Sequence, residues 1–146
     1  MRIISGSLKS KKILTNKNFQ YRPTTSKNRE AIFNTISNLK FFKQYDILRD
    51  SVFLDMFCGS GIMGIEAISR GAKKVYFIDN NAEQLKLLTH NINLLNIQEK
   101  TKIIRSDIKF LPIADIKFDI IFIDPPYFFQ DQKEQPDHLK FFHGYL

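Results

Sequence analysis

The fold of this chain is decided by residues 54–64, which read Leu-Asp-Met-Phe-Cys-Gly-Ser-Gly-Ile-Met-Gly. Apolar residues 52–54 before it predict a buried strand, and residues 61–70 after it predict a helix that ends at Gly71. Between them, Gly59, Gly61 and Gly64 match the G-x-G-x-x-G pattern of nucleotide-binding loops. The stretch therefore predicts a cofactor-binding turn between a strand and a helix.

The rest of the chain repeats this alternation of strand and helix. Further strands are predicted at 75–78, 102–104 and 118–123, and a helix capped by Asn80 or Asn81 carries apolar residues at steps of three and four up to Leu95. The last strand is continuously apolar, as central parallel strands are. This order predicts an α/β protein with a parallel, Rossmann-like sheet.

Acidic residues follow three of the predicted strands. Asp55, Asp79 and Asp107 lie where parallel strands end, which is the edge at which open sheets bind ligands. Asp79 suits the ribose hydroxyls of either NAD or S-adenosylmethionine (SAM), so an NAD-dependent oxidoreductase stays open as an alternative. Asp55 favours SAM, because a carboxylate repels a pyrophosphate but attracts the ammonium group of the methionine moiety. Asp107 is a candidate acceptor for the adenine amine.

A rigid loop follows the last predicted strand and reads Asp124-Pro125-Pro126-Tyr127. The prolines fix the backbone, so the Asp124 carboxylate and the Pro125 carbonyl can accept both N–H groups of an aromatic amine. That arrangement stabilises the positive charge that develops on nitrogen during methylation. Tyr127 can stack on the target ring, which must first leave its own stack if it belongs to a nucleic acid. We interpret the four residues as the catalytic group.

The basic charge is concentrated at the amino terminus. Residues 1–29 contain eight basic residues and no acidic one, whereas residues 30–146 contain fourteen basic and fifteen acidic residues, so the net charge of +7 comes from the first segment. A mobile, solvated arm and a phosphate-binding arm both fit this pattern. Beside an amine-modifying site we favour nucleic-acid binding, with these contact residues: Arg2, Lys9, Lys11, Lys12, Arg22 and Arg29.

Size and composition exclude several other classes. A chain of 146 residues with 43% hydrophobic residues is long enough for one core. No apolar run long enough to span a membrane is present, the single cysteine fits a reducing cytoplasm, and no metal-ligand spacing occurs. We expect a cytoplasmic protein without a metal, built from a basic hairpin extension (1–23, with the hairpin at 2–21) and a cofactor-binding domain (24–146). That domain opens with an amphipathic helix to about Leu39, whose first amides a hydroxyl residue of 24–26 can cap.

The chain resembles the bacterial 16S ribosomal RNA guanine-N2 methyltransferases of the RsmD type. The resemblance rests on residues 2–6, on 22–25 with 29–34, on 54–67 and on 124–127, which match in order. It implies methylation of the exocyclic N2 of one guanine, with the basic hairpin docked on ribosomal RNA of an assembling small subunit. It also implies that Pro23 and Thr24 help to close the SAM site. The full predicted set of cofactor-binding residues is Pro23, Thr24, Asp55, Phe57, Gly59, Ser60, Gly61, Asp79, Asn80, Asp107 and Ile108.

The end of the chain departs from this family. A complete sheet of this kind has about seven strands, and a further crossover unit needs about 30 residues, whereas 19 residues follow Tyr127. We therefore expect an incomplete sheet, with the strand at 118–123 at its edge. Besides the RNA methyltransferase and the NAD-dependent oxidoreductase, an inactive, truncated RNA-binding remnant and a methyltransferase for adenine N6 in DNA stay open. A protein-glutamine methyltransferase shares the same amine-binding residues, but the basic hairpin argues against a protein substrate.

Overall fold

In the computed structural model, residues 1–15, 24–38, 46–107 and 115–125 are described. The elements run in the order α1 (Ser26–Ser37), β1 (Val52–Met56), α2 (Ile62–Ser69), β2 (Lys74–Asp79), α3 (Ala82–Leu95), the 3₁₀ turn η2 (Gln98–Lys100), β3 (Thr101–Arg105) and β4 (Ile120–Ile123). The helices and strands predicted from residue 24 onward are confirmed, with bounds that differ by up to two residues, and η2 is the one element of the described residues that the sequence pattern did not predict.

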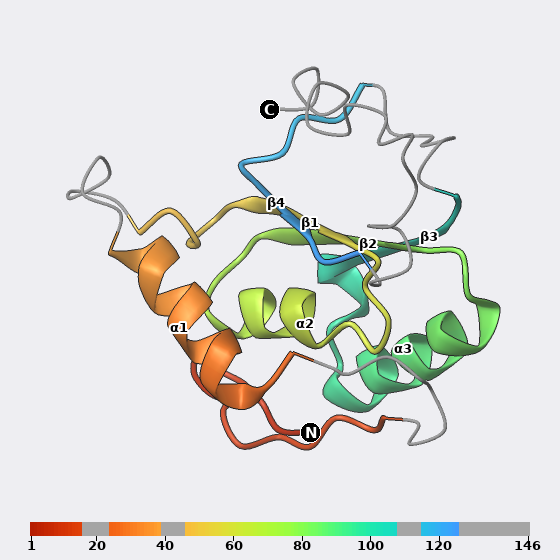
Figure 1. Cartoon of the computed structure of the whole chain (residues 1–146), viewed down its shortest axis with the longest axis horizontal. Coiled ribbons are helices and arrows are strands. Elements are labelled where there is room, and N and C mark those ends of the chain that lie inside the picture. Colours follow the sequence, from red (N-terminus) through yellow and green to blue (C-terminus); the bar gives the residue numbers. More distant parts are fainter. Residues whose placement is uncertain (16–23, 39–45, 108–114, 126–146) are drawn as a thin grey trace, which may run out of the picture.

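The four strands form one parallel sheet in the order β3-β2-β1-β4. Strand β4 pairs with β1 and lies at an edge of the described sheet, as expected. In Figure 1 the three helices α1, α2 and α3 lie on the same side of this sheet. Since every strand is parallel, the carboxyl ends of β1, β2 and β4 meet at one edge, where the predicted site residues follow them.

A compact apolar core lies between the sheet and these helices. Phe53 and Phe77 of the sheet are fully buried, and Phe33 of α1 stacks on Phe53 with a ring distance of 6.5 Å. The caps agree with the sequence: the Thr25 hydroxyl accepts the Asn28 N–H at the start of α1, and the Asn81 side chain accepts two N–H groups at the start of α3. Neither helix therefore begins with all of its first amides unsatisfied.

The amino-terminal arm, residues 1–15, is docked against α2 and α3 and is not a freely solvated tail (Figure 1). Arg2 and Lys12 form an isolated antiparallel bridge in place of the two regular strands of the predicted hairpin. Ile3 and Ile13 are buried, and Asn91 of α3 bonds both backbone groups of Leu14. The mobile-arm interpretation is therefore wrong for residues 1–15.

A buried ion cluster joins the arm to the helices. Glu66 of α2 is 0% exposed and accepts the backbone N–H groups of Ile4 and Ser5 at 2.8 and 3.0 Å. It also accepts Arg70 Nε at 2.9 Å and lies 3.7 Å from Arg29 Nε. Because Glu66 faces four donors from three segments, its carboxylate fixes how the arm, α1 and α2 are arranged.

Candidate active site

The glycine-rich turn after β1 lies at the carboxyl edge of the sheet, and two of its glycines have different roles. Gly59 has φ +52° and a Cβ added there would meet nothing within 4 Å, so this position faces open space. Gly64 lies in α2, where a Cβ would come within 2.3 Å of the Phe77 ring. The first glycine therefore leaves room for a ligand, and the third allows α2 to pack closely on β2.

Replacing Gly64 by alanine should destabilise the protein by about 1–3 kcal/mol, because the new methyl group must displace the buried Phe77 ring and Val75. In the Phe77→Leu background, which removes the ring that the new methyl group meets, Gly64→Ala should cost less than in the wild-type protein. Urea unfolding followed by far-UV circular dichroism measures both costs. An equal cost in the two backgrounds would contradict the packing role of Gly64.

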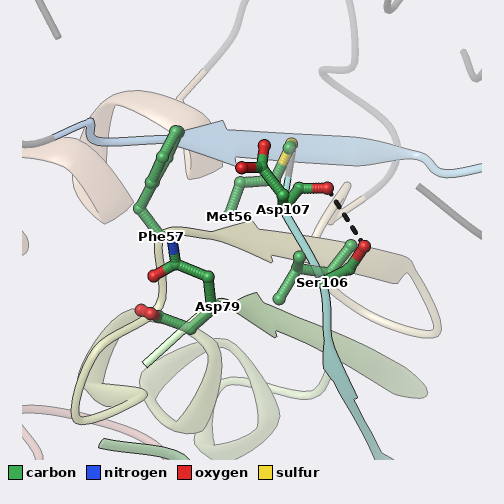
Figure 2. Close-up of a pocket in the computed structure, with 7 residues that line it drawn as sticks. Met56, Phe57, Asp79, Ser106 and Asp107 are labelled. Carbon is green, nitrogen blue, oxygen red and sulfur yellow. Dashed lines mark hydrogen bonds between the residues drawn. The ribbon is translucent and has the colours of Figure 1, made fainter. Parts of the chain in front are cut away.

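A cleft opens at the carboxyl ends of β1, β2 and β3. It has about 280 Å³ of empty space, part of it open solvent, and its lining residues are Met56, Phe57, Ile78, Asp79, Asn80, Ser106 and Asp107. Figure 2 shows Phe57 and Asp79 on one side of this space and Ser106 and Asp107 on the other. Four predicted cofactor residues, Phe57, Asp79, Asn80 and Asp107, thus share one cleft.

Asp79 lines the cleft and also holds the glycine loop through hydrogen bonds. Its Oδ2 accepts the Gly59 N–H at 2.8 Å and its Oδ1 accepts the Asn81 N–H at 2.9 Å. Each carboxylate oxygen has a second lone pair, so Asp79 keeps acceptor capacity for hydroxyl groups of a ligand. The Gly59 N–H is therefore already paired within the protein, with Asp79.

Asp55 lies deeper than predicted. Its side chain is 1% exposed and its Oδ2 accepts the Gly64 N–H at 2.8 Å, so it satisfies one of the first amides of α2. Burial raises its pKa to about 8, with smaller contributions from the Asp79 and Asp124 carboxylates, while the Gly64 bond acts in the opposite direction. A direct contact between Asp55 and a ligand ammonium stays a prediction.

The contribution of Asp55 to the stability of the protein should fall as pH rises from about 4 to about 8. The unfolded Asp55 carboxyl loses its proton near its ordinary pKa of about 3.9, whereas the folded one keeps it up to a pKa of about 8. The folded state therefore holds the extra proton in this window, and its advantage shrinks by up to about 1.4 kcal/mol per pH unit. Urea titrations at several pH values measure this. Asp55→Asn should flatten the profile, and parallel profiles for the two proteins would contradict the assignment.

The end of β4 supplies the predicted amine-binding group. Asp124 is exposed and its Oδ2 accepts the Thr24 hydroxyl at 3.1 Å; Pro125 beside it is half-buried. Asp124 also lies close enough to Asp55 to affect its pKa. The structure thus brings Thr24, Asp55, Asp79 and Asp124 to one edge of the sheet. The other predicted site residues at Arg22, Pro23, Ile108, Pro126 and Tyr127 lie outside the described residues.

The basic residues divide into two groups. Arg2, Lys9, Lys11 and Lys12 are exposed on the docked arm. Arg29 is 0% exposed and lies against Glu66, so its predicted contact with RNA is wrong. An acidic residue inside the apolar segment 62–69 was the available sequence signal, because a buried carboxylate needs a cationic partner.

The described part of the chain has no helix that is both long and apolar enough to cross a membrane.

Ser60, the remaining residue of the predicted cofactor loop, is half-buried between Gly59 and Gly61. Cys58 in the same loop is buried, and burial raises the pKa of its thiol, which disfavours the nucleophilic thiolate. The carboxylates and the backbone of the glycine loop therefore remain as the groups of the site that can bind a ligand.

Comparisons with known proteins agree with the geometry. The family described as "Conserved hypothetical protein 95" matches residues 1–141. A "Putative rRNA methyltransferase YlbH" of Bacillus subtilis is 36% identical over 131 residues, which are 87% of this chain and 67% of that protein. A "Ribosomal RNA small subunit methyltransferase D" of Buchnera aphidicola is 39% identical over 126 residues, which are 86% of this chain and 62% of that protein.

Among solved structures, a putative methyltransferase yhhF from Escherichia coli superposes with a TM-score of 0.78 at 24% identity, covering 99% of this chain and 72% of the other. This likeness shows the Rossmann-like fold that the sequence predicted. The chain spans about two thirds of the length of the curated relatives named above. The incomplete sheet agrees with this partial coverage.

Proposed function

This chain belongs to the Conserved hypothetical protein 95 family, and from that premise we propose that it is a SAM-dependent methyltransferase for the exocyclic N2 of a guanine in small-subunit ribosomal RNA. The names of the relatives supply the reaction class and the RNA. The guanine and its N2 atom rest on the family resemblance. The site must then be compatible with a cationic donor and an aromatic amine.

The observation that carries the proposal is the gathering of three carboxylates, Asp55, Asp79 and Asp124, around the glycine loop. The mutual repulsion of these groups contributes to the raised pKa of Asp55. A cationic ligand favours the ionised form of Asp55, whereas the pyrophosphate of NAD disfavours it. The charge of the site therefore favours SAM over the dinucleotide that the same glycine pattern also fits.

The chemical groups that line the cleft are suited to the parts of SAM. Asp79 retains lone pairs for ribose hydroxyls, Phe57 offers an apolar face, and Gly59 leaves the loop open to a ligand. The predicted adenine contact of Asp107 and the contact of Asn80 are consistent with their places in the same cleft. A bound donor supplies an electrophilic methyl carbon on a sulfonium.

At the amine, Asp124 and the Pro125 carbonyl accept the two N–H groups and aim the nitrogen lone pair. Their partial negative charges stabilise the cation that forms as nitrogen bonds the methyl carbon and the carbon–sulfur electron pair leaves with sulfur. One N–H proton then passes from nitrogen to solvent water, to which Asp124 is exposed. The exposed Arg2, Lys9, Lys11 and Lys12 of the arm bind RNA phosphates by displacing counterions.

The direct test is methyl transfer from isotopically labelled SAM to small-subunit particles and to deproteinised ribosomal RNA that lack the modification. Mass spectrometry of the digested RNA should find labelled N2-methylguanosine. Thermal-shift measurements with SAM and with NAD, run in parallel, should give a shift with SAM alone. Labelled N6-methyladenosine, or stabilisation by NAD alone, would overturn the assignment; SAM binding without transfer to RNA would favour the inactive remnant.

A further inference from the structure

One hydrogen bond joins the amino-terminal segment to the candidate amine site. The Thr24 hydroxyl donates to Asp124 Oδ2 at 3.1 Å, although the two residues are 100 positions apart. Asp124 is exposed, and within the described ranges this is the one hydrogen bond that its carboxylate makes. An exposed aspartate without such a bond samples several rotamers. Thr24 therefore restricts the carboxylate that the proposed reaction needs in one orientation.

Thr24 is itself held by a rigid part of the molecule. It precedes the capping residue of α1, and its carbonyl accepts Arg29 Nη1 at 3.4 Å. Arg29 is fully buried, lies against Glu66 and donates through Nη2 to the Arg2 carbonyl at 2.8 Å. The guanidinium thus connects the backbone of Thr24 with the backbone of the basic arm.

We propose that Thr24 is a positioning residue for Asp124 and that it acts in the methyl-transfer step. This inference rests on the proposed function. The hydroxyl occupies one lone pair of Oδ2, which leaves Oδ1 and the other lone pair of Oδ2 to accept from the substrate amine. Through Arg29, the segment that carries the basic arm also sets the position of this hydroxyl.

The test compares Thr24→Val, which keeps the shape of the side chain but removes the hydroxyl, with Thr24→Ser, which keeps the hydroxyl. Thr35→Val is the matched control, because Thr35 is an exposed residue of α1, the helix that Thr24 precedes, and its hydroxyl donates to the Ala31 carbonyl. For each protein we would measure single-turnover methyl transfer at saturating RNA and SAM, the KM for both, the Kd for SAM by calorimetry, and the melting temperature.

Thr24→Val should lower the single-turnover rate about 10- to 100-fold, since small misplacements of a reacting group cost rate on this scale. Its Kd for SAM and its melting temperature should stay at the wild-type values. Thr24→Ser should recover most of the rate, and Thr35→Val should behave as wild type.

The outcomes separate this inference from the function on which it rests. An active wild-type protein with an equally active Thr24→Val variant overturns the positioning role alone. A rate loss that Thr24→Ser shares, or that comes with weaker SAM binding, also overturns it, because steric closure of the donor site would then be the role of Thr24. A wild-type protein that binds SAM but transfers no methyl group overturns the proposed function and this inference together.

Discussion

Asp124→Ala should abolish methyl transfer to RNA, with a loss of at least about 10²–10³-fold in kcat, while SAM binding stays close to wild type. In the proposed reaction this carboxylate accepts from the amine; in the structure it contacts Thr24, and the described cleft is lined by other residues. Removing a preorganised group that stabilises developing charge costs rate on this scale. Single-turnover transfer and calorimetric titration with SAM measure the two quantities separately.

Two further variants sharpen this result. Asp115→Ala, which removes another exposed aspartate in the same described segment, should leave transfer unchanged. Asp124→Asn should retain a residual rate above that of Asp124→Ala, because its amide oxygen still accepts one N–H while its NH₂ group repels the other. An Asp124→Ala protein with turnover within a few-fold of wild type would remove the carboxylate from the mechanism.

Local sequence patterns predicted the sheet, the glycine loop and the caps because each depends on residues that are near one another in the chain. Thr25 and Asn81 cap helices through bonds that span two or three residues, and the glycine pattern fixes its own turn. Parallel strands end at one edge whatever their loops contain, so Asp55, Asp79 and Asp124 could be placed together without coordinates.

Contacts between distant segments could not be predicted, because local sequence patterns carry no information about them. The Thr24–Asp124 bond joins residues 100 positions apart, and the arm reaches Glu66 across about 60 positions. Sequence patterning also treats a basic residue near other basic residues as surface charge, which is why Arg29 was assigned to RNA. Its burial follows from Glu66, since a carboxylate inside an apolar helix is stable there only with cationic and N–H partners.

Glu66→Leu should lower the free energy of unfolding by about 3–5 kcal/mol, because it leaves Arg29 as a buried charge without its partner. It also leaves the Ile4 and Ser5 N–H groups without the carboxylate that accepts them. Burial already lowers the pKa of Arg29, and the Glu66 carboxylate acts against that shift, so the guanidinium depends on this partner. The chain contains no tryptophan, so urea unfolding is followed by far-UV circular dichroism.

Matched variants distinguish the effect of the buried Arg29–Glu66 pair on stability from a general effect of removing a charge. Glu30→Gln, an exposed residue of α1, should change stability by less than about 0.5 kcal/mol. Arg29→Met combined with Glu66→Leu should cost less than the sum of the two single changes, because the double variant no longer buries an unpaired charge. Additive losses would show that Arg29 and Glu66 act independently. In that case the loss in Glu66→Leu would come from the undocked arm, and RNA binding would weaken in Glu66→Leu but not in Arg29→Met.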